Sequence, residues 1–135
     1  MLIYLDSMIL IYAFDSTDDF HSRATTRLDA LNAARDTVVV SDLTRMECRM
    51  LPLRINDTVR LARLNAFFKL LDVIVTSMTA AIFDRAAEIR AKYNFTALDS
   101  LHLAAAIDSG GELFITNDKR LTKFQEAEVA IELLP

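Results

Sequence analysis

The chain has 135 residues, of which 53% are hydrophobic and 25% are charged, and its formal net charge is −4. A chain of this length forms one ordinary domain, and the hydrophobic fraction argues against disorder. No apolar run approaches the roughly 20 residues that a membrane span needs, and no basic segment precedes the first apolar run, so we expect neither a span nor a signal peptide. Cys48 is the single cysteine, which excludes a disulfide framework and a cysteine-based zinc site and predicts a small buried thiol. We therefore expect one cytoplasmic domain over residues 1–135.

Apolar runs and turn signals predict alternating strands and helices along the chain. Short apolar or β-branched runs predict strands over residues 2–5, 37–40, 73–75, 113–116 and 129–133. Caps and helical spacing predict helices over residues 7–14, 20–34, 41–51, 58–70, 79–93, 98–107 and 119–124. Pro52 should stop or bend the third of these helices. This alternation implies a parallel sheet covered on both faces, so we predict the α/β class, with one three-layer α/β/α domain around a mostly parallel sheet of four or five strands.

Four acidic residues lie at the ends of these elements. Asp6 ends the first strand run and Asp118 follows the fourth, whereas Glu47 and Asp99 stand near the starts of apolar helical stretches. In open α/β sheets, ligands bind in the crevice beyond the carboxyl ends of the strands. Four acids converging there would be hard to keep ionised without a cation, and hard oxygen ligands favour Mg²⁺ or Mn²⁺. Such a site can activate a water for phosphodiester hydrolysis.

Each acid also has a purely structural explanation. Asp6 and Asp118 can cap the helices that follow them. Glu47 can complete a capping box with Thr44, and Asp99 stands in a similar pattern. However, Asp99 begins a helix that is apolar nearly all round, so its carboxylate should stand at the rim of the core. This placement favours a shared acidic site, in which Glu47 is the weakest member.

Polar and basic neighbours fit a phosphate substrate more loosely. Ser7, Thr116 and Asn117 adjoin Asp6 and Asp118, where they can orient ligands or waters or merely end a strand. Residues 45–92 hold nine Lys or Arg and five Asp or Glu, whereas each flanking stretch holds three basic and seven acidic residues. This basic middle can attract a polyanion, or it can consist of solvated helix faces.

Two arginines and several packing residues complete the set of candidates. Arg45 and Arg49 flank Glu47 on the same predicted helix, where they can meet a backbone phosphate or form surface salt bridges. His102 stands three residues after Asp99, and we interpret it as a packed core histidine. The methionines that we interpret as gap-filling core side chains are Met8, Met46, Met50 and Met78.

Four segments of the chain together resemble a known family. They read Ile-Tyr-Leu-Asp-Ser-x-Ile-Leu-Ile-Tyr, Ser-x-Leu-Thr-x-x-Glu, Thr-Ala-Leu-Asp-Ser-Leu-His-Leu-Ala-Ala-Ala and Phe-Ile-Thr-Asn-Asp. In this order they resemble PIN-domain ribonucleases over nearly the whole chain, and the nearest subgroup is the VapC-type toxins of toxin–antitoxin pairs. The resemblance implies a PIN-like fold in which the four acids bind Mg²⁺ or Mn²⁺, with Asp6 and Asp99 as the most direct ligands. Met8 departs from the Asn or Ser that relatives often carry, which removes a possible polar contact near Asp6.

The resemblance also implies a homodimer, an RNA substrate and a small antitoxin that blocks the site. We therefore expect a metal-dependent endoribonuclease, the toxin of such a pair, that hydrolyses RNA with a metal-activated water. The alternative is a non-catalytic dimeric module that retains the fold and binds RNA or protein, against which the four intact acids argue. A receiver-type signalling domain is disfavoured because it needs an acceptor Asp after the third strand and a Lys after the fifth, and the sequence has neither.

Overall fold

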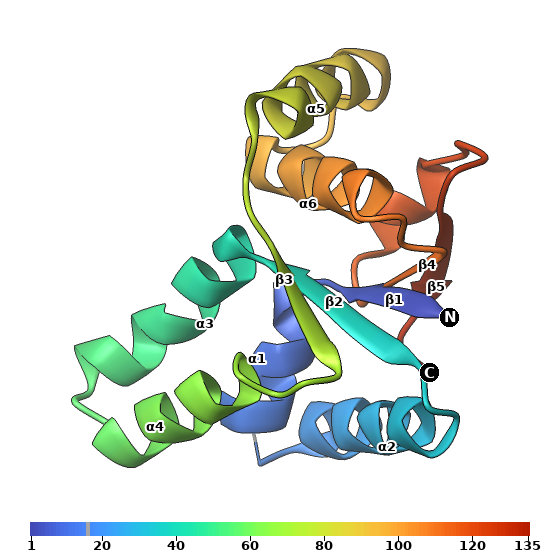
Figure 1. Cartoon of the computed structure of the whole chain (residues 1–135). Coiled ribbons are helices and arrows are strands. Elements are labelled where there is room, and N and C mark those ends of the chain that lie inside the picture. The colour runs from blue at the N-terminus through green and yellow to red at the C-terminus, as the bar shows by residue number, and fades with distance from the viewer. Residues whose placement is uncertain (16) are drawn as a thin grey trace.

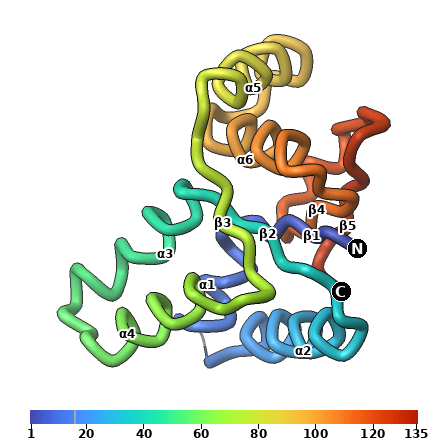
Figure 2. The backbone as a smooth tube through the Cα atoms, viewed as in Figure 1, coloured from blue at the N-terminus to red at the C-terminus, as the bar shows by residue number. Residues whose placement is uncertain are grey.

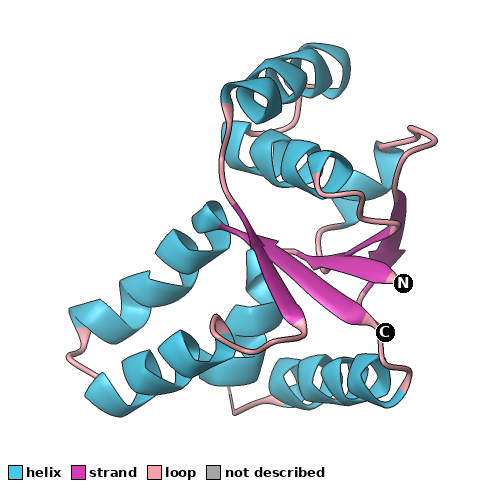
Figure 3. Ribbon diagram, viewed as in Figure 1, coloured by secondary structure: helices cyan, strands magenta, loops and turns pink. Residues whose placement is uncertain are grey.

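The chain folds around a fully parallel five-stranded sheet. The structure is a computed structural model that describes every residue except Ser16. Neighbouring strands pair in parallel in the order β3-β2-β1-β4-β5. Figure 3 shows the strands crossing the middle of the molecule between two groups of helices. The predicted three-layer α/β/α fold is confirmed. The strands are β1 (Leu2–Leu5), β2 (Thr37–Ser41), β3 (Val73–Thr76), β4 (Leu113–Thr116) and β5 (Ala130–Leu133).

Helices cover both faces of this sheet. The first four helices lie on one side and the last two on the other (Figures 1 and 2). A short 3₁₀ helix, η1 (Lys119–Lys123), follows β4 and packs with the second group through Leu121. The α-helices are α1 (Ser7–Asp15), α2 (Asp19–Ala33), α3 (Asp42–Arg54), α4 (Thr58–Phe67), α5 (Ala80–Tyr93) and α6 (Ala97–Asp108).

Two hydrophobic clusters fill the layers, one on each face of the sheet. Successive strand residues point to opposite faces. Tyr4 and Phe114 therefore join the cluster under α5 and α6, whereas Ile3, Leu5 and Ile115 join the cluster under α1 to α4. Continuous apolar runs are needed here because both faces of a parallel sheet are buried. The central strands β1 and β4 are accordingly the most buried part of the sheet.

The strand order places a crevice between β1 and β4. From β1 the chain adds β2 and β3 on one side, and it later adds β4 and β5 on the other. The order therefore reverses between β1 and β4, and a doubly wound sheet binds ligands at such a switch point. Asp6 follows β1 and Asp118 follows β4 at this place.

Two packing predictions need correction. The helix α3 continues past Pro52 and ends at Arg54, so Pro52 does not stop the helix at residue 51. The core prediction is wrong for Met8, Met46 and Met50, whose side chains are 40%, 50% and 45% exposed. Met78 packs against the cluster under α5 and α6 as expected. None of the helices in the described part of the chain combines the length and apolar character of a membrane span.

Candidate functional site: an acidic cavity at the sheet edge

A cavity of about 320 Å³ opens at the carboxyl ends of β1 and β4. It receives side chains from the ends of both strands and from α1, α3 and α6. All four acids expected from the sequence line it, although they are separated by up to 112 positions in the chain. The lining residues are Asp6, Met8, Tyr12, Glu47, Asp99, His102, Asn117, Asp118 and Lys119.

Asp6 is the most buried of the four acids. Its side chain belongs to a residue only 8% exposed, and its backbone N–H donates to Ile115 O at 2.9 Å, which ties the end of β1 to β4. Thr116 Oγ1 donates to Asp6 Oδ2 at 2.7 Å. Burial and the nearby charges of Asp99 and Glu47 raise the pKa of Asp6, although His102 and the Thr116 hydrogen bond oppose this rise. A cation near Asp6 would stabilise its ionised form.

Glu47 points to the cavity from the second turn of α3. Its Oε1 accepts a hydrogen bond from Ser7 Oγ at 2.9 Å and lies 2.5 Å from His102 Nε2. Burial alone would raise the pKa of Glu47, but the hydrogen bonds and charge of His102 and the bond from Ser7 outweigh it and lower that pKa. The capping box of α3 is formed by Ser41 and Thr44 instead. Glu47 therefore lines the cavity with the other three acids, and the capping alternative does not hold.

Asp99 and Asp118 stand at helix starts and share one cationic neighbour. Thr96 Oγ1 accepts from the Asp99 N–H at 3.2 Å, and Asp118 Oδ1 caps η1 by accepting from the Arg120 N–H at 2.9 Å. The Arg120 guanidinium hydrogen-bonds both Asp118 oxygens and lies 3.5 Å from Asp99 Oδ2. These contacts hold the pKa of Asp118 below its usual value. Asp118 is therefore a cap and a cavity acid at the same time.

The three polar neighbours expected beside the acids lie at the site. Ser7 bonds Glu47, and Thr116 bonds Asp6. Asn117 lines the cavity, and its Nδ2 donates to the Tyr12 hydroxyl at 3.1 Å. These contacts orient the surrounding groups in the way that outer partners orient metal ligands.

Arg45 and Arg49 do not line this cavity. Arg49 Nη1 donates to Asn65 Oδ1 at 2.7 Å, and the Arg45 guanidinium lies 4.9 Å from the centre of the Phe68 ring. Both side chains therefore turn toward α4 and its end. The nearest basic groups are instead Lys119 and Arg120, which the sequence reasoning missed.

The donors around the cavity fit a hard divalent cation with water in its shell. In the part of the chain that the structure describes, no three His, Cys, Asp or Glu side chains are grouped closely enough to hold an ion by themselves. Mg²⁺ usually keeps several waters and takes only one or two direct carboxylates. Asp6, Glu47, Asp99 and Asp118 line one cavity, which suits an ion that keeps part of its water shell.

A family model decides the classification of the chain. The model described as the PIN domain matches residues 3–127. The chain belongs to the PIN-domain family. No curated protein sequence matches it significantly. The expected family resemblance is thus confirmed for almost the whole chain.

Solved structures share this PIN fold at low sequence identity. A chain of VapBC2 from Rickettsia felis, bound to a DNA fragment from its promoter, has a TM-score of 0.74 and 17% identity, with 100% of both chains covered. A toxin–antitoxin complex from Klebsiella pneumoniae gives 0.72 and 21%, with 95% of each chain covered. Mycobacterium tuberculosis VapC20, a toxin that cleaves the sarcin–ricin loop, gives 0.72 and 17%, covering 93% of this chain and 97% of that chain.

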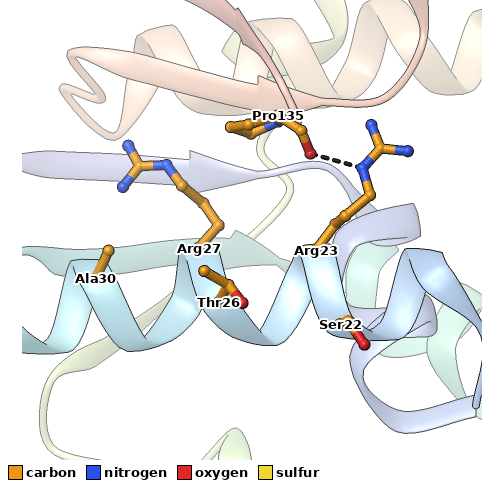
Figure 4. Close-up of a pocket in the computed structure, with 6 residues that line it drawn as sticks. All are labelled: Ser22, Arg23, Thr26, Arg27, Ala30 and Pro135. Carbon is orange, nitrogen blue, oxygen red and sulfur yellow. Dashed lines mark hydrogen bonds between the residues drawn. The ribbon is translucent and has the colours of Figure 1, made fainter.

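A second cavity lies away from the acids, between α2 and the C-terminal residue. Figure 4 shows Arg23 and Arg27 on α2 beside Pro135, and Arg23 Nε donates to Pro135 O at 2.6 Å. Arg27 forms an ion pair with Glu132 at 2.7 Å. This cavity of about 270 Å³ contains none of the predicted site residues. Its arginines join α2 to β5 and the end of the chain, which is a structural role.

Proposed function

We propose that this PIN-domain protein is a metal-dependent endoribonuclease and the toxin of a toxin–antitoxin pair. The observation that carries the proposal is the gathering of Asp6, Glu47, Asp99 and Asp118 around one cavity at the switch point of the sheet. A non-catalytic domain has no need to keep four carboxylates together, because they repel one another. Burial raises the pKa of Asp6, and a bound cation would stabilise the ionised form of this carboxylate.

Each acid has a role in this proposal. A bound Mg²⁺ or Mn²⁺ would supply an activated water and neutralise charge on the cleaved phosphate. Asp6 and Asp99 would hold the ion, while Glu47 and Asp118 would hold its waters. Thr116 and Ser7 keep Asp6 and Glu47 in place through the hydrogen bonds described above.

The cations that contact the RNA phosphate differ in this proposal from the two arginines expected from the sequence. Arg45 and Arg49 were the candidates, but their contacts with Asn65 and Phe68 occupy them elsewhere. Lys119 lines the cavity, and Arg120 stands beside it on η1. We assign the RNA phosphate contact to these two cations.

The partners follow from proteins of the same fold. Two of the similar structures are described as a VapBC complex and a toxin–antitoxin complex, and a third as a toxin that cleaves the sarcin–ricin loop. By likeness to them, this chain takes an RNA substrate and a cognate antitoxin protein. We propose further that it acts in the cytoplasm as a homodimer.

The direct test replaces single carboxylates by amides. Asp6→Asn and Asp99→Asn should each abolish RNA cleavage in the presence of Mn²⁺, because an amide cannot supply the negative charge that holds the ion. Circular dichroism should show an unchanged fold. Asp84→Asn, which removes an exposed acid on α5, serves as the matched control and should cleave normally.

Full activity in either site variant would contradict the assignment. A different result favours the non-catalytic alternative: the unchanged protein binds RNA, does not cleave it, and shows no heat of binding with Mn²⁺. Calorimetric titration and gel analysis of RNA fragments together separate these outcomes.

A further inference from the structure

We propose that His102 is a positioning residue, which fixes the carboxylate of Glu47 at the acidic cavity through a buried chain of hydrogen bonds. The chain runs from Glu47 through His102 and Tyr4 to Ser41. This inference rests on the proposed function, because it assigns a supporting role within the same site.

His102 reaches Glu47 from a different helix. It lies three residues after Asp99 on α6, so both side chains share one side of that helix. The residue is only 2% exposed, and its Nε2 lies 2.5 Å from Glu47 Oε1. A carboxylate oxygen carries no hydrogen of its own, so Nε2–H donates to it. Helix α6 thus carries both Asp99, which lines the cavity, and His102, which contacts Glu47.

The other ring nitrogen is also held. His102 Nδ1 lies 2.7 Å from the hydroxyl of Tyr4, and this hydroxyl also forms a hydrogen bond with Ser41 Oγ at 2.9 Å. Burial raises the pKa of Tyr4 far above its usual value, which keeps the phenol hydrogen in place. The Tyr4 ring stacks on Phe114 with centres 5.3 Å apart. The imidazole is therefore fixed in position by groups that cannot move freely.

The far end of the chain returns to the helix that carries Glu47. Ser41 ends β2, and its N–H donates to Thr44 Oγ1 at 3.1 Å in the capping box of α3. The hydrogen bonds thus close a circuit from the start of α3, through β1 and α6, back to Glu47 in the second turn of α3. These hydrogen bonds link α3 to α6, the helices that bear Glu47 and Asp99.

The circuit leaves one carboxylate oxygen for the site. Ser7 and His102 both bond Oε1 of Glu47, so Oε2 remains for the cavity that Glu47 lines. Without these bonds, the long side chain of Glu47 would have several rotamers to choose from. A core histidine that merely satisfied its own hydrogen bonds would not need an acid of the cavity as its partner.

The test measures Mn²⁺ binding, which does not require turnover. Isothermal calorimetry on the full chain compares the unchanged protein with His102→Leu and His102→Gln. His102→Leu should weaken Mn²⁺ binding by about tenfold, the lower end of what loss of an outer-shell partner costs. His102→Gln should recover part of this loss, because its amide can donate to Glu47. Tyr4→Phe, which frees Nδ1 of the ring, should give a smaller loss.

A double-mutant cycle with Glu47→Gln separates positioning from packing. If His102 acts through Glu47, His102→Leu causes no further loss of Mn²⁺ affinity in the Glu47→Gln background. Independent losses in the two backgrounds would overturn the proposal. If His102→Leu does not fold, the cycle uses His102→Gln and Tyr4→Phe, and unchanged affinity in both would overturn it equally.

The same titration distinguishes this proposal from the proposed function. An unchanged protein that neither binds Mn²⁺ nor cleaves RNA would overturn both. An unchanged protein that binds Mn²⁺ and cleaves RNA, together with His102→Leu that binds as tightly, would overturn the positioning role alone.

Discussion

Arg120 is the cation that competes most directly with a metal ion at the site. Its guanidinium contacts Asp118 and approaches Asp99, while its side chain is largely exposed. Exposed ion pairs are weak, so a divalent ion should displace this arginine at small cost. Arg120→Ala should therefore strengthen Mn²⁺ binding by about two- to fivefold, as measured by calorimetry.

Lys119→Ala provides the control for that measurement. It removes the same charge from the neighbouring position on η1, but Lys119 shares no ion pair with the site acids. Its effect on Mn²⁺ affinity should therefore be smaller than that of Arg120→Ala. Equal effects of both variants would indicate a general charge effect and contradict the competition.

Cys48 should be an unreactive thiol in the folded protein. The residue is 2% exposed, and its Sγ lies 3.9 Å from Ser7 O. Burial, and then the charges of nearby acids, raise its pKa from 9.0 to about 12. Because only the thiolate is nucleophilic, labelling by a thiol reagent near neutral pH should be slow, and it should become fast when denaturant unfolds the chain. Rapid labelling without unfolding would contradict this prediction.

The same pKa shift gives the sign of a pH effect on stability. A folded pKa above the unfolded value means that folding favours the protonated thiol. Its contribution is therefore fully present below about pH 9 and is lost as pH rises toward about 12. Cys48→Ala should flatten this alkaline decline in the denaturation midpoint.

Single residues of the site differ in how far the sequence reveals them. Asp6 and Asp118 could be predicted because each follows an apolar strand run, and the direction of parallel strands then brings them together. The directions of Arg45 and Arg49 could not be predicted, because their contacts with Phe68 and Asn65 depend on how α4 packs beside α3, which no local pattern specifies. The contact of His102 with Glu47 joins positions 55 residues apart, which periodicity cannot reveal.

At the scale of elements, the sequence predicted the ends of strands and helices well where an apolar run or a capping residue marked them. Strand β4 occupies the predicted residues, and α5 begins after its Thr79 cap, where Oγ1 accepts from the Ile82 N–H. The predicted end of α3 at residue 51 was wrong, because the helix continues through Pro52 to Arg54. The exposed methionines of α3 were misplaced because hydrophobicity alone does not tell which face of a helix meets the sheet.

The end of α5 offers a test of a local backbone requirement. Asn94 follows the helix with a φ of 59°, and its N–H donates to Arg90 O at 2.8 Å. A side chain other than Asn or Asp strains in this left-handed region by about 1 kcal/mol. Asn94→Ala should lower the free energy of unfolding by about that amount, whereas Asn94→Gly should leave it nearly unchanged. Urea denaturation measures both, and equal stability of the Ala and Gly variants would contradict the strain.

At the scale of the whole molecule, the fold brings part of the basic stretch of the sequence against its acidic ends. Cations of the basic stretch, residues 45–92, pair with acids from the two acidic ends. Arg60 approaches Asp15, and Lys92 contacts Glu126. Three of the nine cations of this stretch, Arg60, Arg85 and Lys92, are therefore paired with acids that lie outside it. The sequence alone could not show this, because the paired residues lie far apart in the chain.

The salt dependence of RNA binding should report how few cations remain for the substrate. For single strands, the slope of log affinity against log salt is about −0.7 per phosphate contacted. Contacts from Lys119 and Arg120 alone predict a slope of about −1.4 for Asp99→Asn, which should bind RNA without cleaving it. A second subunit that supplies the same pair would double the slope to about −2.8, so the value also tests the proposed homodimer. A slope of about −6 would mean that the nine cations of residues 45–92 carry the binding instead.

Lys119→Ala should make the slope shallower by about 0.7, whereas Arg54→Ala, at the remote end of α3, should leave it unchanged.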